Sequence, residues 1–469
     1  MRRRPTKEQF QQQLEQMVQT IRDDIIKGVY PAGDYLPSEK TLVSQFGMSN
    51  NSIRIGLEQL VEEGWIEKVA RLGNRVAPGR PPVKLKLLCN EMPLRNLKLR
   101  QLLDGFHKKY PWITVETTVT AGLLGFGNKE EPIPGDVVLL TSYQFQQAAE
   151  EGKTVWLEET AENPAIYPQV NALYRHKDVM YMQPLIFSPI MLCYNKSHFR
   201  ESGLLEPDGS WRWDDLIRHA ELLSDGKSRY GFCFHIPDGN RWPVFLLQSM
   251  ERFEWDENGK LKDIRGSKLM ESIQICKRII LNAKAFPRYL SESNDDIDRM
   301  FMEGKVSMTL TSYMALNGLI DSGLEYDVSP MPFIREMRTL GIALGAGVLR
   351  QSGRKEEAAL LVDYLTSVEG QTFIRTNTMS VPSVGNLPSP PETGGMYRPS
   401  RAMMYREILS SLRTHGELNV SLQTLYGIGN LLKGYWADLI DEEELCSRLS
   451  DQLSKPQTIR EAAPAGDWG

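Results

Sequence analysis

Residues 38–76 contain a helix, a glycine turn, a second helix and a short hairpin in direct succession. Ser38 is predicted to cap the first helix, which Gly47 ends, and Ser49 begins the second helix. The strand after the second helix turns back at Gly73, which leaves a wing of two short strands. This order of elements predicts a winged helix-turn-helix, a fold that places its second helix in the major groove of DNA.

The spacing of apolar residues fixes which side of the second helix is buried. Ile53, Leu57 and Leu60 recur at helical spacing, and an apolar helix over about residues 7–27 precedes them. Near the beginning of the helix, the opposite side carries polar residues, most of which have short side chains. Its members are Asn50, Asn51, Ser52 and Arg54.

Three ordered segments in residues 10–76 resemble the winged-helix domain of GntR-type bacterial regulators: IKGVYPAGDYLPSEKTLVSQFGMS, IRIGLEQLVEEGWIEK and LGNRV. The resemblance implies DNA contacts from the first helix, the beginning of the second helix, the arginine one turn in, and the wing. The predicted DNA-binding residues are Ser38, Lys40, Ser49, Asn50, Asn51, Ser52, Arg54, Arg71 and Gly73.

Two positions depart from that family's pattern. Asn50 stands where an arginine is usual, and Arg71 stands where the first wing glycine is common. Because asparagine pairs with adenine whereas arginine prefers guanine, the hypothesis is an altered operator sequence. An alternative remains for Arg54, which could be a solvated charge or a partner of Glu58. Ser38 could likewise be only a helix cap.

Charge and chain length predict a second, larger part. Residues 1–82 carry 12 basic and 10 acidic side chains, in a chain of 469 residues with a net charge of −5. This balance allows one basic-edged DNA-binding module but predicts weak non-specific affinity with steep salt dependence. We expect a DNA-binding domain over residues 1–77, a proline-rich linker over 78–82, a sensor domain over 83–454 and a loose tail over 455–469.

Composition also indicates where the protein is located and whether it binds a metal. No stretch reaches about 18 uninterrupted apolar residues, and a DNA-binding helix occupies the place of a signal peptide, so we expect a cytoplasmic protein without membrane contact. The five cysteines are far apart and predict buried, reduced thiols. The six histidines show no metal-ligand spacing, so no metal or cofactor is expected.

The second part alternates strands and helices, which predicts an α/β fold. Four later segments, in order, resemble the extracellular solute-binding proteins of sugar-importing ABC transporters: IMLCYNKSHFRESGL, WRWDDLIRHAELL, MFMEGKVSMTLTSY and GAGVLRQSGRKEEAALLVDYLTSVEGQTFI. The resemblance implies a periplasmic-binding-protein-like (Venus-flytrap) domain, in which two α/β lobes joined by hinge strands hold a small solute. The export signal is replaced here by the DNA-binding domain, so the solute is expected to be sensed inside the cell.

Ligand contacts are predicted beyond the carboxyl ends of strands, where open α/β sheets bind small molecules. Aromatic faces pack on sugar C–H surfaces, and amides and carboxylates bind hydroxyls, so a carbohydrate is the expected ligand. The predicted ligand-binding residues are Ser142, Tyr143, Gln144, Phe187, Ser188, Asp238, Asn240, Trp242, Tyr313 and Gly345. Trp242 and Tyr143 could equally be core residues, and Asp238 could be only a turn residue.

These features predict a homodimeric regulator whose binding to double-stranded operator DNA responds to a sugar or oligosaccharide, and not an enzyme. One alternative is a GntR-type regulator fused to an aminotransferase-like domain with pyridoxal phosphate. The Ser-Lys pairs at 267–268 and 454–455 lack the phosphate-binding loop that this reaction needs. The other alternative is a glycoside-processing domain, which needs two convergent carboxylates, and no motif singles out such a pair.

Overall fold

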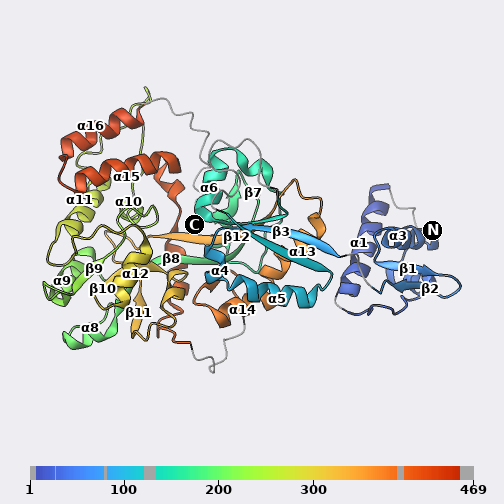
Figure 1. The fold of residues 1–469 in the computed structure, drawn as a ribbon. Helices are drawn as coiled ribbons and strands as arrows, with labels where there is room; N and C mark the ends of the chain where they lie inside the picture. Colours follow the sequence, from blue (N-terminus) through green and yellow to red (C-terminus); the bar gives the residue numbers. More distant parts are fainter. Residues whose placement is uncertain (1–6, 27, 79–81, 121–133, 388–395, 455–469) are drawn as a thin grey trace. The chain divides into compact units, whose positions relative to one another are not determined.

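The computed structural model describes residues 7–26, 28–78, 82–120, 134–387 and 396–454. The chain divides into two compact units (Figure 1), one made of residues 1–85 and 103–116 and the other of residues 86–102 and 117–469. The predicted tail, and residues 79–81 of the predicted linker, lie outside the described residues. The domain boundaries drawn from the sequence therefore stay predictions.

The first unit contains the winged helix: α1 (Lys7–Ile26), α2 (Glu39–Phe46), α3 (Asn50–Glu62), β1 (Ile66–Val69) and β2 (Gly73–Val76). The predicted helix caps are confirmed, because Ser38 Oγ accepts from the N–H of Thr41 and Ser49 Oγ from the N–H of Ser52, both at 3.2 Å. Gly47 ends α2 in the left-handed conformation at φ 66°. These local signals fix where each helix begins and ends.

The core of the winged helix lies between α1 and α3. Buried side chains of α1 meet the apolar stripe of α3 that the sequence predicts, and Gly56 of α3 lets the two helices approach closely. A Cβ at Gly56 would lie 2.1 Å from Cε of Met17. The wing strands pair antiparallel, with Ile66 opposite Val76. This packing leaves the beginning of α3 and the wing turn exposed.

The second unit is built on a mixed sheet whose central strands run in the order β5 (Val137–Thr141), β12 (Thr339–Val348), β8 (Gln183–Asn195), β10 (Val306–Ser312) and β9 (Tyr230–Cys233). β3 (Val83–Cys89) pairs parallel with β5, and β4 (Ile113–Val119) follows β3 in the sheet order. Three short strands join the sheet beside β8 and β12. They are β11 (Tyr326–Ser329), β13 (Val381–Pro382) and β14 (Leu412–Arg413). A separate hairpin consists of β6 (Arg175–His176) and β7 (Val179–Met180).

The long strands β8 and β12 connect two lobes, each with its own hydrophobic core. β8 is buried along its whole length and pairs with β12 over its first half and with β10 and β11 over its second half. The first lobe gathers around β5. It includes α4 (Met92–Asn96), α6 (Ser142–Glu150), α7 (Pro168–Asn171), α13 (Lys355–Thr366) and α14 (Val368–Asn377), and α5 (Leu99–Lys109) lies partly in each unit.

The second lobe gathers around β9 and β10 (Figure 1). Its helices are α8 (Lys196–Glu201), α9 (Trp213–Leu223), α10 (Pro243–Gln248), α11 (Lys268–Leu281), α12 (Asn294–Met302), α15 (Leu422–Trp436) and α16 (Glu442–Leu453). The two-lobed α/β fold with hinge strands is thereby confirmed. All five cysteines are buried and form no disulfide.

Candidate functional site

The predicted DNA-binding face centres on the exposed beginning of α3. Asn50, Asn51 and Arg54 are exposed there, and Lys40 is exposed on α2. Ser38 and Ser49 act as the caps of their helices, which leaves their hydroxyls close to where a phosphate would approach a helix N-terminus. Asn50, Asn51 and Arg54 thus present amide and cationic groups together near the beginning of α3.

Arg54 has a partner that the sequence did not indicate. Its Nε donates to Glu39 Oε2 of α2 at 2.8 Å, instead of pairing with Glu58 one turn along α3. The side chain of Arg54 remains 59% exposed. The ion pair therefore orients the guanidinium while leaving most of it open to solvent.

Ser52 and the wing differ from the rest of this face. Ser52 is buried, and its hydroxyl lies 2.7 Å from that of Ser49, so it supports the helix start and is not presented to solvent. Gly73 has φ +112°, and a Cβ added there would meet no atom within 4 Å, so backbone conformation alone favours glycine at this position. Arg71 is exposed and also has a positive φ, 69°.

A cavity of about 270 Å³ lies between the beginning of α6, the loop before α10 and one face of α15. Tyr143 reaches it from the first lobe, and the other lining residues belong to the second lobe. They are Pro237, Asp238, Gly239, Asn240, Trp242, Leu422, Leu425, Tyr426, Gly429, Asn430 and Lys433. Four residues predicted to bind ligand therefore line one cavity: Tyr143, Asp238, Asn240 and Trp242.

The carboxylate of Asp238 in the cavity wall is fixed by an ion pair and by hydrogen bonds. The side chain of Asp238 is 12% exposed, lies 3.4 Å from Arg241 and accepts from Nδ2 of Asn294 at 2.7 Å. Burial raises the pKa of Asp238, but Arg241 and the hydrogen bonds from Asn240 and Asn294 outweigh burial and hold this pKa below its usual value. Asp238 is therefore an ionised acceptor at the cavity wall.

Tyr143 supplies a protonated hydroxyl. Burial, followed by the carboxylates of Glu150 and Asp238, raises the pKa of Tyr143 above its usual value. Its ring packs edge to face against the ring of His415, with the ring centroids 5.6 Å apart. His415 Nε2 lies 2.7 Å from the carbonyl oxygen of Gly239. Burial lowers the pKa of His415, which favours a neutral ring that donates to Gly239. These contacts tie the first-lobe wall of the cavity to the loop of the second lobe.

The other six predicted ligand residues do not line the cavity. The side chains of three of them form hydrogen bonds with the backbone. Ser142 Oγ accepts from the N–H of Ala343, and Ser188 Oγ accepts from the N–H of Tyr313. Gln144 completes the capping box of α6. The rest are interior residues. Phe187 and Tyr313 are almost fully buried, and a Cβ at Gly345 would lie 2.8 Å from the ring of Tyr174.

Helix α15 contributes residues that were not predicted from the sequence. Tyr426, Asn430 and Lys433 line the cavity at intervals of four and three residues, which places them on one face of the helix. The polar residues that recur on one face of the otherwise apolar stretch LYGIGNLLKGYW were the sequence signal that could have predicted these cavity residues. Gly429 belongs to the same face, where a Cβ would lie 3.0 Å from the ring of Trp242.

Two classes of site are missing from the part of the chain that the structure describes. No group of three or more His, Cys, Asp or Glu side chains is placed to hold a metal ion there. Among the described helices, none combines the length and apolarity needed to cross a bilayer.

Comparison with known proteins agrees with this architecture. Residues 13–76 match the family described as bacterial regulatory proteins, gntR family, and residues 96–372 match the bacterial extracellular solute-binding protein family. Neither is an enzyme family, so the alternatives of an aminotransferase-like or glycoside-processing domain are not supported.

Individual relatives match over limited lengths. A Brucella abortus protein whose name describes a binding protein is 24% identical over 196 residues, which are 39% of this chain and 46% of that protein. The Uxu operon regulator of Haemophilus influenzae is 25% identical over 171 residues, 35% of this chain and 61% of the regulator. The chain thus covers less than two thirds of the length of either relative.

A solved structure shows the same fold in the larger domain. The ABC substrate-binding protein of Listeria monocytogenes in complex with cycloalternan aligns with a TM-score of 0.64 at 18% identity, over 79% of this chain and 98% of that one. The match to the solute-binding family covers more than half of the chain and includes both lobes. The chain belongs to the bacterial extracellular solute-binding protein family and carries a gntR-family regulatory domain ahead of its binding domain.

Proposed function

We propose that this chain is a transcription regulator whose binding to operator DNA is controlled by a small carbohydrate held in the 270 Å³ cavity. One observation carries the proposal. A cavity lined by aromatic, amide and carboxylate side chains lies in a domain with a sugar-binding fold, and the same chain carries a gntR-family winged helix. We further propose that it acts as a homodimer on double-stranded DNA in the cytoplasm.

The lining of the cavity suits a polyhydroxylated ligand. The rings of Tyr143, Trp242 and Tyr426 offer flat surfaces for sugar C–H groups. Asp238 accepts hydrogen bonds, and Asn240 and Asn430 can both donate and accept them. A saccharide presents both kinds of surface on one molecule. An apolar ligand would leave the buried Oδ1 of Asn240 unsatisfied, since this atom has no hydrogen-bond partner among the described residues.

Ligand control would act through the two lobes. Because the cavity takes residues from both, a bound sugar stabilises the arrangement in which both walls touch it. In a dimer, such a change would alter how two recognition helices meet half-sites one DNA turn apart. A coupling free energy of about 1–3 kcal/mol would change operator affinity roughly 5- to 150-fold.

The test uses the full chain and two measurements. Thermal unfolding with a panel of mono- and oligosaccharides identifies any sugar that stabilises the protein. Footprinting on a duplex selected from a randomised library is then repeated with and without that sugar. If no sugar raises the unfolding temperature, the proposed ligand class is wrong. If one does but the footprint and its affinity stay unchanged, the proposed control of DNA binding is wrong.

A further inference from the structure

Lys433 brings a positive charge to the cavity of about 270 Å³. Of the described residues that line this cavity, Lys433 alone is cationic and Asp238 alone is anionic. Lys433 lies in the last turn of α15, is exposed, and donates to Asn430 Oδ1 at 3.1 Å. Because Asn430 also lines the cavity, this hydrogen bond keeps the ammonium group at the cavity wall.

The negative charge of Asp238 is already offset by the protein. Arg241, whose side chain is 5% exposed, lies 3.4 Å from Asp238 Oδ2. The same oxygen accepts from Asn294 Nδ2 at 2.7 Å, and Oδ1 accepts from the N–H of Asn240 at 2.9 Å. Asp238 therefore has a charged partner and two hydrogen-bond donors before any ligand binds.

The carboxylate of Glu150, which contacts a lining residue, is also engaged. Its Oε1 accepts from Gln146 Nε2 at 2.9 Å, and its Oε2 accepts from the N–H of Leu422 at 2.9 Å. Leu422 is the first residue of α15, and the partial positive charge of that helix end offsets the negative charge of Glu150. Neither Asp238 nor Glu150 therefore depends on Lys433 as a partner.

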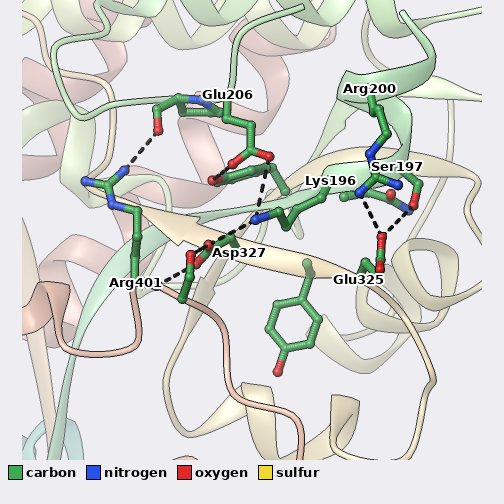
Figure 2. A network of polar contacts seen from close by, with 12 residues as sticks. Lys196, Ser197, Arg200, Glu206, Glu325, Asp327 and Arg401 are labelled. Atoms are coloured by element: carbon green, nitrogen blue, oxygen red, sulfur yellow. Dashed lines mark hydrogen bonds and ion pairs between the residues drawn. The ribbon is translucent and has the colours of Figure 1, made fainter.

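Lys433 has no carboxylate partner of its own. Across the described ranges of the chain it forms no ion pair, and its hydrogen bond goes to a neutral amide. Lys196 of α8, by contrast, lies 3.7 Å from both Asp327 and Glu206 (Figure 2). Because an amide oxygen accepts a hydrogen bond without neutralising an ammonium group, the cavity keeps one uncompensated positive charge.

A carboxylate on the ligand matches this charge. A hexuronic acid carries one carboxylate on a sugar ring, and its C–H faces remain available to Tyr143 and Tyr426. The carboxylate adds the attraction of opposite charges to the hydrogen bond from Lys433, which a neutral hydroxyl lacks. A phosphate dianion exceeds the single charge of Lys433 and would lie close to the carboxylate of Asp238 in the same wall.

We propose that the ligand is a sugar acid whose carboxylate is bound by Lys433, an inference that rests on the proposed function. Lys433 selects acidic over neutral sugars, while the aromatic and amide side chains of the cavity bind the rest of the ring. A cation in the last turn of a helix also stabilises that helix, but this role does not distinguish acidic from neutral ligands. The ratio of the two affinities therefore tests the inference.

Calorimetric titration of the full chain measures affinity for matched pairs of sugars. The pairs are glucuronate with glucose, galacturonate with galactose and digalacturonate with galactobiose, and the 6-phosphates of glucose and galactose complete the set. For at least one pair, the wild type is expected to bind the acid about tenfold more tightly than the neutral sugar, since hydrogen bonds between charged groups are the stronger class. Lys433→Gln should reduce this ratio to about threefold or less, and Lys433→Arg, which keeps the charge, should retain it.

Lys227→Gln is the matched control, because it removes the same charge at an exposed position of the second lobe away from the cavity. Its ratio of acid to neutral affinity should equal that of the wild type. A neutral sugar or a 6-phosphate that the wild type binds as tightly as any uronate overturns the inference and leaves the proposed function standing. The inference is also overturned if Lys433→Gln keeps the wild-type ratio, even where urea unfolding shows a loss of stability. Absence of binding by every probe and by the whole saccharide panel refutes the carbohydrate ligand itself.

Discussion

The main-chain N–H of Leu422 donates to Glu150 Oε2 at 2.9 Å. Glu150 is the last residue of α6 in the first lobe, and Leu422 is the first residue of α15 in the second lobe. A carboxylate at a helix N-terminus interacts favourably with the unpaired N–H groups and the helix dipole. Since Leu422 also lines the cavity, this bond joins the lobes beside the proposed ligand.

Glu150→Ala is expected to weaken binding of any sugar that stabilises the wild type by about two- to fivefold. The lost interaction corresponds to roughly 0.5–1 kcal/mol for a solvent-exposed carboxylate at a helix N-terminus. Calorimetric titration measures the affinity. Glu151→Ala is the control, because Glu151 interacts with Gln147 and Lys153 of its own segment. Equal affinities of the two variants would show that the contact between the lobes plays no part in binding.

Tyr426→Ala is expected to lower sugar affinity about tenfold, because an aromatic contact that covers a sugar face contributes about 1 kcal/mol or more. Tyr426 is 67% exposed, so the free energy of unfolding should change by less than about 0.5 kcal/mol. Titration and urea unfolding separate the two effects. Gln423→Ala, at an exposed position of the same helix away from the cavity, should match wild type in both measurements.

The winged helix could be predicted element by element because its boundaries carry local signals. Ser38 and Ser49 each determine a helix start because the side-chain hydroxyl accepts a hydrogen bond from a backbone N–H, and Gly47 ends α2 in the left-handed conformation. Those signals need no knowledge of distant residues. The alternation of strands and helices likewise indicated the α/β class, although it did not specify that β8 would be shared by both lobes.

The cavity was predictable only in part, because its walls come from distant segments. The expectation that ligands bind beyond strand ends selected the loop that contains Asp238, which lines the cavity. It also selected Phe187 and Tyr313, which do not line the cavity and instead pack against Tyr405. Nothing local to those two residues indicates that Tyr405 packs on them. Tyr426 was missed because the apolar pattern around it is typical of a core helix, although Asn430 and Lys433 on the same face of α15 were a signal that could have singled it out.

Asp298 of α12 should make stability depend on pH. Burial raises the pKa of this carboxyl from its ordinary value of 3.8 to about 6, although Arg241 and Arg95 oppose the shift. With a folded pKa above the unfolded one, the folded state binds more protons between about pH 4 and pH 6, so stability is greatest below this window and falls as pH rises through it. The loss amounts to at most about 3 kcal/mol.

Asp298→Asn should remove that dependence. The difference in unfolding free energy between the variant and wild type is expected to grow in favour of the variant from about pH 4 to about pH 6 and to stay constant above it. Urea unfolding at a series of pH values measures it. Exposed Asp321→Asn serves as the control and should parallel wild type. A pH-independent difference for Asp298→Asn would contradict a raised pKa.

The ion pair between Arg54 and Glu39 should affect DNA binding more than stability. Exposed ion pairs contribute about 0.2–1 kcal/mol, so Glu39→Gln should leave unfolding nearly unchanged. Removal of a negative charge beside α3 should raise affinity for duplex DNA, whereas Arg54→Ala should lower it and reduce the salt dependence by about one phosphate contact. Glu63→Gln removes the same charge at the end of α3 and should have the smaller effect on affinity. Identical salt dependence for wild type and Arg54→Ala would exclude a phosphate contact by Arg54.

Asn50 is the residue most able to test the predicted operator preference, because it is the first residue of α3 and is exposed. An asparagine side chain pairs with the N6 and N7 groups of adenine, whereas an arginine pairs with O6 and N7 of guanine. Selection from a randomised duplex library should therefore show one position per half-site that changes from adenine to guanine in Asn50→Arg. Each such contact discriminates by about 1–3 kcal/mol, which is large enough for the selected sequences to differ clearly. Asn50→Ala should lose preference at that position alone, and an unchanged consensus for Asn50→Arg would mean that Asn50 does not contact a base.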